Sequence, residues 1–144
     1  MARFVKGDVV VVPFPFSDLT HAKRRPALVV AELEGDDLIL CQITSQRIKD
    51  KYAVPIEDND FETGGLKQRS NVRPNRIFTA DRHIILYCVG HLKPDKTNEV
   101  IENSRYFMTM NYATSDNRAY LASLRNFAYT GNDMTTTPLE ERDL

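Results

Sequence analysis

The sequence lacks the features that mark several classes of protein. It contains no tryptophan and 2 cysteines among 144 residues, too few for the disulfide framework of a small secreted domain. Both cysteines fall in apolar stretches, so we expect Cys41 and Cys88 to be reduced, buried thiols. No apolar run approaches the ~18 residues that span a membrane, and the apolar start has no cleavage site typical of a signal peptide. We therefore expect a cytoplasmic protein without a membrane partner.

Sequence motifs for metal and nucleotide binding are missing too. The 3 histidines are scattered, and neither the phosphate-cradling GxxxxGK[ST] nor the GxSxG of a nucleophile elbow is present. We expect neither a metal nor a cofactor. The net charge of −1 does not indicate a generally basic surface, so any contact with nucleic acid must be local. The sequence offers two basic clusters: Lys23, Arg24 and Arg25 in one, and Lys67, Arg69, Arg73 and Arg76 in the other.

What is present is a series of short, strand-like stretches separated by turn residues. Such stretches occur at 9–12, 26–33, 38–43, 52–56 and 84–89, with an extended piece at 70–74 continued by 77–79. Proline cannot donate to an interior ladder, so the PFPF at 13–16 is expected to end the first strand. The acidic segment 57–65 is expected to be a surface loop.

A helix is expected to follow the strands, beginning near Pro94 with Asp95 as its N-cap. Residues at helical spacing would form its buried face: Val100, Ile101, Ser104, Phe107 and Met108. Five or six short strands followed by a helix predict a mainly β (α+β) fold, a small barrel-like sheet. We assign residues 1–108 to this barrel domain. Residues 109–144 form a C-terminal extension with a predicted helix at 116–130 and a flexible end.

One predicted hairpin carries polar residues at its open end. A two-residue loop at 35–36 would pair Ala27 with Thr44. Arg25 would then pair with Gln46, and Arg25, Thr44 and Gln46 would share one face. An arginine beside hydroxyl and amide groups suits an oxyanion such as phosphate. The alternative is that these are solvated edge charges and the start of a loop.

Three residues near this hairpin also have two interpretations each. Phe14 and Phe16 either close the core at one end of the barrel or form an aromatic lip on which a base stacks. His21 is either a solvated loop residue or a general base or phosphate contact.

Three segments together resemble the MazF/PemK-like toxins of bacterial type II toxin–antitoxin systems: GDVVVVPFPFSDLTHAKRRPALVV (7–30), ITSQ (43–46), and SNVRPNRIFTAD through VGHL (70–92). The resemblance implies a small SH3-like, MazF/CcdB-like barrel, usually a homodimer, and sequence-specific cleavage of single-stranded RNA (mRNA) without a metal. In that family the arginine of the RP motif and the threonine of the T-x-Q motif are the catalytic pair. They fall on Arg25 and Thr44.

The resemblance also suggests partners and further roles. A cognate antitoxin protein is the expected protein partner. One branch of the family has an acidic residue where this chain has Asn75, and an amide cannot act as a base. His21 is therefore our candidate proton acceptor. We expect RNA contacts from both basic clusters and from neighbouring polar residues: Lys23, Arg24, Ser45, Gln46, Lys67, Arg69, Ser70 and Arg73.

The extension and the activity each leave an alternative open. Residues 109–144 exceed the usual length of the family, and they either pack on the barrel or extend the dimer, or they lie over the basic groove and mimic an antitoxin segment. The alternative function is a non-catalytic binding toxin on the same barrel. It would be a gyrase poison of the CcdB type or an inactive member that only binds its antitoxin.

Overall fold

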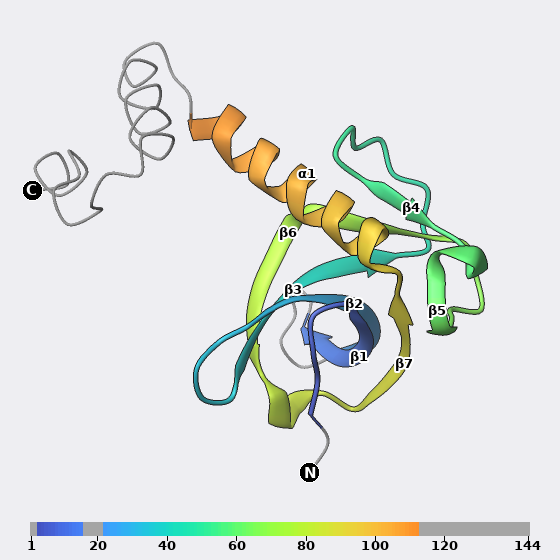
Figure 1. Ribbon diagram of the computed structural model, residues 1–144, viewed down its shortest axis with the longest axis vertical. Helices are drawn as coiled ribbons and strands as arrows, with labels where there is room; N and C mark the ends of the chain where they lie inside the picture. Colours follow the sequence, from blue (N-terminus) through green and yellow to red (C-terminus); the bar gives the residue numbers. More distant parts are fainter. Residues whose placement is uncertain (1–2, 16–21, 113–144) are drawn as a thin grey trace, which may run out of the picture. The chain divides into compact units, whose positions relative to one another are not determined.

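The computed structural model describes residues 3–15 and 22–112. Within them the chain forms one curled antiparallel sheet with strand order β4-β6-β3-β2-β1-β7-β5 and a helix, α1, against one side of it (Figure 1). The mainly β class is confirmed. The predicted helix at 116–130, Phe16 and His21 lie outside the described residues. The elements are β1 (Asp8–Pro15), β2 (Ala22–Glu32), β3 (Asp37–Thr44), β4 (Val54–Ile56), η1 (Asp58–Asp60), β5 (Phe61–Gly64), β6 (Ser70–Asp81), η2 (Arg82–Ile84), β7 (Tyr87–Leu92) and α1 (Pro94–Tyr112).

The sheet buries apolar side chains on both of its faces. Successive residues of a strand point to opposite faces, so Val9 joins the cluster that contains Val100 of α1, while Val10 joins the cluster on the other face. All residues from Val9 to Val12 are consequently buried. Burial on both faces explains why this strand is an uninterrupted apolar run rather than an alternating one.

The prediction that PFPF ends the first strand is wrong, because β1 continues to Pro15. Pairing of β1 with β7 stops at Val11, whose carbonyl accepts a hydrogen bond from Leu86 N at 2.9 Å. Alternate residues direct their backbone groups to the same side of a strand. The backbone nitrogens of Pro13 and Pro15, which carry no hydrogen, therefore face the side where β7 has already ended. No hydrogen bond of the ladder is lost.

Two further predictions about elements are corrected. Residues 57–65 are not only a loop, because they contain η1 and β5. Asp95 is not the N-cap of α1, because the helix begins one residue earlier and the Lys93 carbonyl accepts the amides of Lys96 and Thr97. Proline suits the first helical position, where its missing N–H is not needed. Asp95 then lies in the first turn, where its negative charge favours the helix dipole.

The buried stripe of α1 is narrower than predicted. Val100 and Ser104 are buried, but the side chain of Met108 is 52% exposed. The compact unit that carries the sheet ends at Phe107. No helix among the described residues is long and apolar enough to cross a membrane.

The prediction of two buried thiols is half right. Both cysteines are free, but only Cys41 is buried and Cys88 is exposed. Burial raises the pKa of the Cys41 thiol to about 11, opposed by its hydrogen bond with the Ser104 hydroxyl. Burial also raises the pKa of Cys88, opposed by a hydrogen bond with the backbone of Gly90, while the nearby Asp8 carboxylate adds to the increase.

Candidate functional site

The β2–β3 hairpin has a different register from the predicted one. Leu33 N donates to the Asp37 carbonyl at 3.0 Å, so the loop has three residues, with Gly35 at φ +83°. This loop also separates Glu34 from Asp37, which the two-residue loop would have set directly opposite each other. A bulge at residue 30 moves the register once more, and Ala27 lies opposite Gln42 instead of Thr44.

The predicted grouping of faces survives this correction, because the total change of register is two residues. A change of two keeps every side chain on its face, whereas a change of one would reverse it. Arg25 lies two residues before Ala27, and Thr44 lies two residues after Gln42, so both belong to the face of the Ala27–Gln42 pair. Continuing that register would set Arg25 opposite Thr44 itself.

Strand β6 adds two more polar residues to this face. Gln42 pairs with Arg73 and Thr44 pairs with Asn71, and cross-strand partners share a face. Gln42, Asn71 and Asp50, which pairs with Arg73, were missed in the sequence. The period of two through Gln42, Thr44 and Gln46 would have identified Gln42, but the position of Asn71 depends on long-range strand pairing.

The side chains of the central pair differ in exposure. Arg25 is half-buried on β2, opposite Val12 of β1. Thr44 is 6% exposed, and its Oγ1 accepts a hydrogen bond from Gln46 N at 3.1 Å. This bond fixes the hydroxyl at the point where β3 ends. A threonine hydroxyl that accepts one bond can still donate its own hydrogen to a ligand.

Arg73, the ladder partner of Gln42, forms an ion pair with Asp50 in which both side chains are largely covered. Asp50 Oδ2 is 3.6 Å from Arg73 Nη2, and the two side chains are 8% and 22% exposed. Within the described residues, Gln42 Oε1 and Asn75 Oδ1 are buried without a hydrogen-bond partner. Buried polar groups without a partner are uncommon in native proteins. These two acceptors belong to the ladder partner of Arg73 and to a residue two positions after it.

Asn75 lies in an irregular part of β6. Cys41 pairs with Ile77 and Gln42 with Arg73, which leaves residues 74–76 as a bulge. Bulges redirect side chains and are frequent beside active sites. The bulge is attached to α1 through a hydrogen bond of 2.8 Å from Ser104 Oγ to the Pro74 carbonyl.

Next to Thr44 the surface is hollowed by a depression of about 510 Å³. Ser45 and Gln46, both predicted RNA contacts, are exposed on its wall. Two arginines give the depression a positive lining, and Ile48 supplies an apolar wall. The lining residues are Ser45, Gln46, Arg47, Ile48, Arg69 and Asn71.

The second basic cluster is mixed with acidic residues. Arg69 Nε lies 3.3 Å from Glu57 Oε1, and Lys67 lines a second depression, of about 350 Å³, together with Glu57 and Asp58. Ser70 is 3% exposed, and its hydroxyl donates to the Gln68 carbonyl at 3.0 Å. Lys67 and Arg69 are therefore accessible to a ligand, whereas the Ser70 hydroxyl is buried in a local turn.

The first basic cluster lies along β2. Lys23 and Arg24 are exposed, opposite Phe14 and Pro13 of β1. Phe14 packs edge-to-face on Phe78, with ring centroids 5.2 Å apart. This contact favours core closure over an aromatic lip for Phe14.

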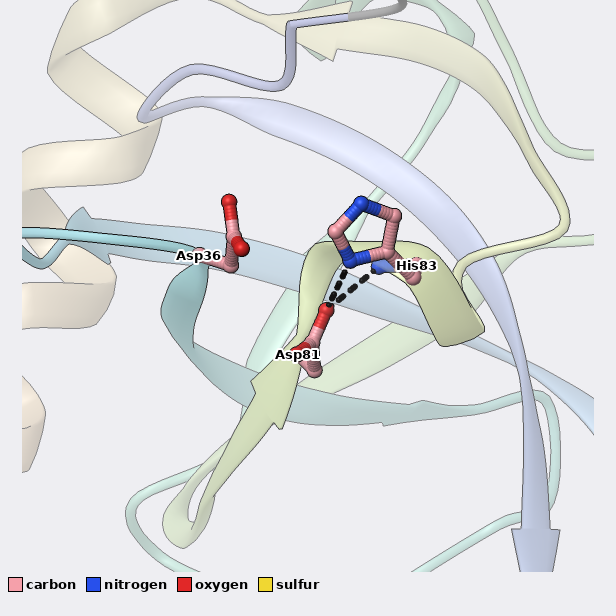
Figure 2. A group of neighbouring side chains, drawn as sticks. All are labelled: Asp36, Asp81 and His83. Carbon is pink, nitrogen blue, oxygen red and sulfur yellow. Dashed lines mark hydrogen bonds and ion pairs between the residues drawn. The ribbon is translucent and has the colours of Figure 1, made fainter.

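One cluster of possible metal ligands occurs among residues 3–15 and 22–112, at the end of the sheet where β6 meets η2. Asp36, Asp81 and His83 bring their ligand atoms within 4.8 Å of one another (Figure 2). Asp81 accepts bonds from the backbone amide and the ring Nδ1 of His83, which hold its pKa below the usual value. Asp36 lies 3.6 Å from Arg82 Nε. The three groups are thus engaged in local contacts, and nothing else there points to a metal.

The sequence and the fold were compared with known proteins. A sequence model of the PemK-like, MazF-like toxins of type II toxin–antitoxin systems matches residues 5–107. No curated protein sequence matches. An endoribonuclease from a Mycobacterial species, solved in complex with its cognate antitoxin, has 14% identity and a TM-score of 0.60, over 74% of this chain and 96% of that chain. MazF in a MazE–MazF complex from Deinococcus radiodurans has 19% identity and a TM-score of 0.60, over 76% and 99%.

At these identities the structural likeness establishes the fold, and the sequence match establishes the family. The matched residues include β1 to β7, most of α1, and both Arg25 and Thr44. The chain therefore belongs to the PemK-like, MazF-like toxins of type II toxin–antitoxin systems.

Proposed function

We propose that this toxin is an endoribonuclease that cleaves single-stranded RNA at specific sequences without a metal. The observation that carries the proposal is the position of Arg25 and Thr44 on one face of the sheet, beside a depression with two arginines in its lining. Single-stranded RNA is bound through its phosphates and through bases splayed out of the stack. Arginines next to the exposed amide of Gln46 fit both kinds of contact.

In the proposed reaction the RNA supplies its own nucleophile. The 2′-hydroxyl loses its proton, its oxygen bonds to the adjacent phosphorus, and the bond from phosphorus to the 5′-oxygen breaks. The leaving 5′-oxygen takes up a proton, which gives 2′,3′-cyclic phosphate and 5′-hydroxyl ends. Negative charge grows on the non-bridging oxygens, where the Arg25 guanidinium and the Thr44 hydroxyl would donate hydrogen bonds.

Arg25 is assigned to charge stabilisation and positioning, because a guanidinium has N–H donors only and no site that could accept a proton. Asn75 cannot accept the proton. We therefore keep His21 as the proposed general base. An imidazole in that role would make the rate fall as the pH drops below its pKa.

The proposal extends to the partners and the site of action. A cognate antitoxin would inhibit the toxin, as the MazE–MazF complex from Deinococcus radiodurans suggests by its composition. We propose a homodimer in the bacterial cytoplasm whose RNA groove runs across the interface between the two copies, so that Lys67, Arg69 and Arg73 also reach RNA bound to the partner copy.

The test is a cleavage assay in excess EDTA. Single-stranded RNA is incubated with the full-length protein, and the ends are identified by their chemistry. We expect 5′-hydroxyl and 2′,3′-cyclic phosphate ends, and no cleavage by Arg25→Ala. Arg3→Ala is the matched control, because its side chain is 78% exposed and is paired with Glu32 on another part of the surface. An RNA with a 2′-deoxy nucleotide at the mapped site should remain intact.

Two results would contradict the proposal. Cleavage that EDTA abolishes would show that a metal takes part. Absence of cleavage in the wild type would favour the alternative, a non-catalytic toxin that binds gyrase or only its antitoxin.

A further inference from the structure

Asp50 is the starting point, because it is a buried carboxylate outside any strand. It lies between β3 and β4, and its side chain is only 8% exposed. The Oδ1 atom of Asp50 accepts a hydrogen bond from Tyr52 N at 3.0 Å, and the backbone carbonyl of Asp50 accepts one from Ala53 N at 3.1 Å. These bonds fix the carboxylate in a tight turn. Buried aspartates are rare unless they are paired, and the partner of this one is Arg73.

The ion pair determines where the charge of Arg73 lies. Arg73 Nη2 is 3.6 Å from Asp50 Oδ2, which is longer than a hydrogen bond, so the contact is ionic. An arginine carries five N–H donors in a planar fork. Asp50 approaches one edge of the fork, and Arg73 Nε is buried without a hydrogen-bond partner among the described residues. The guanidinium is thus held on one side. Because Nε has no exposed surface while the side chain is 22% exposed, the donors left for a ligand are those of the terminal nitrogens.

The strand register puts this arginine beside the proposed catalytic threonine. Arg73 pairs with Gln42, and Asn71, two residues earlier on the same face, pairs with Thr44. The turn containing Asp50 also belongs to the segment that carries Ser45 and Gln46 in the wall of the depression. One carboxylate therefore connects Arg73 with the segment after Thr44.

We propose that Asp50 is a positioning residue of the proposed nuclease, which holds Arg73 where its free N–H groups bind a phosphate of the RNA. This inference rests on the proposed function. Asp50 itself does not touch the RNA. Its effect comes from fixing a flexible side chain before the substrate arrives, so that less conformational freedom is lost on binding.

The direction in which Asp50→Asn changes RNA binding distinguishes a positioning role from a purely electrostatic one. A carboxylate that acted only through its charge would repel RNA, and Asp50→Asn would then strengthen binding. A positioning carboxylate predicts the opposite. We expect Asp50→Asn to lower kcat/KM for RNA by roughly 10- to 100-fold, because a small misplacement of a binding group can cost up to about 10²-fold.

Glu57→Gln is the matched control. Glu57 also pairs with an arginine, Arg69 at 3.3 Å, but the two side chains are exposed, at 53% for Glu57 and 69% for Arg69. Exposed pairs of this kind contribute little to holding a side chain. Glu57→Gln should therefore leave kcat/KM unchanged or raise it slightly, while Asp50→Asn lowers it.

The decisive measurement is a double-mutant cycle on kcat/KM. If Asp50 acts through Arg73, Asp50→Asn should have no further effect in a protein that already carries Arg73→Ala. Equal losses in both backgrounds, or tighter RNA binding by Asp50→Asn, would overturn the inference. Asp50→Glu keeps the charge and should recover part of the lost activity. If the wild type cleaves RNA and Asp50→Asn changes nothing, this inference fails while the proposed function remains.

A second measurement is made on the wild-type protein, and a variant is needed only to assign the resonance. The Nε–H resonance of Arg73 is assigned by its loss in Arg73→Lys. In the free protein it should exchange slowly with water, and it should shift when an uncleavable 2′-deoxy RNA analogue is added. Rapid exchange, like that expected for the exposed Arg69, would show that Asp50 does not hold the guanidinium.

Discussion

Ser104 of α1 donates a hydrogen bond of 2.8 Å from its Oγ to the carbonyl of Pro74 in the bulge of β6. The same oxygen lies 3.8 Å from Cys41 Sγ on β3. One buried hydroxyl therefore joins the helix to the two strands that carry Thr44 and Arg73. The helix supports the polar face from behind, without supplying a residue to it.

Ser104→Ala should destabilise the fold by about 1–3 kcal/mol, because the buried Pro74 carbonyl would lose its donor. Urea unfolding measures the effect. Asn98→Ala, at an exposed position of the same helix, is the control and should change stability by less than ~0.5 kcal/mol. Similar values for the two variants would mean that the bulge does not depend on Ser104.

Cys41 should make stability fall at alkaline pH. Its pKa in the folded protein is about 11, raised by burial from the ordinary value of 9.0. The unfolded chain therefore ionises this thiol first, and its stabilising contribution is complete below pH 9 and is lost as the pH rises toward 11. The free energy of unfolding should therefore fall by about 3 kcal/mol over this range of pH. In Cys41→Ala this part of the pH dependence should disappear, and an unchanged slope between pH 9 and 11 would contradict the assignment.

Gly64→Ala should be far more damaging than Gly35→Ala. Both glycines have positive φ, +66° and +83°, so an alanine is strained at each position by about 1–2 kcal/mol. A Cβ on Gly64 would also lie 2.1 Å from the Val89 carbonyl oxygen, whereas a Cβ on Gly35 meets nothing within 4 Å. We expect a loss above ~4 kcal/mol for Gly64→Ala. Thermal unfolding of the two variants measures both losses. Gly35→Ala reports backbone strain alone, and Gly64→Ala reports the same strain together with the steric clash.

Thr44→Ala should reduce the RNA cleavage rate by about 10²- to 10³-fold, the usual loss for one donor to a developing oxyanion. Thr44→Ser keeps the hydroxyl that also accepts the amide of Gln46, and it should retain most of the activity. Single-turnover rates at saturating RNA isolate the chemical step. A serine variant as slow as the alanine variant would show that the hydroxyl is not what matters.

Arg24→Ala should weaken RNA binding equally for all sequences. Arg24 is exposed on β2, and loss of one phosphate contact lowers the slope of log affinity against log salt by about 0.7 for single strands. Titrations with an uncleavable RNA at several salt concentrations give this slope. Arg105→Ala on α1, where the guanidinium lies 3.5 Å from Glu102, provides the comparison and should leave the slope unaltered.

The sequence was sufficient to predict the class of fold and the common face of Arg25 and Thr44. Alternation along a strand depends only on local geometry, so it survived an error of two residues in the register. The register itself was wrong because it depends on a three-residue loop and a bulge at residue 30. Bulges are selected by packing between strands, which no local pattern encodes.

Asp50 shows the limit of sequence reasoning for the candidate site. It lies between Lys49 and Lys51 in a polar segment. Such a pattern normally predicts a solvated aspartate on the surface. Its burial arises only when the segment folds back onto β6 and meets Arg73. Only the tertiary structure reveals this contact, because the two residues are far apart along the chain.

The prolines of β1 also bear on how the protein behaves at high concentration. Beyond Val11 this strand has no β7 neighbour, and an open strand edge invites pairing with a second molecule. Pro13 and Pro15 remove the amide hydrogens that such pairing would use on that side. Pairing of this edge with a strand of a second molecule is therefore disfavoured at Pro13 and Pro15.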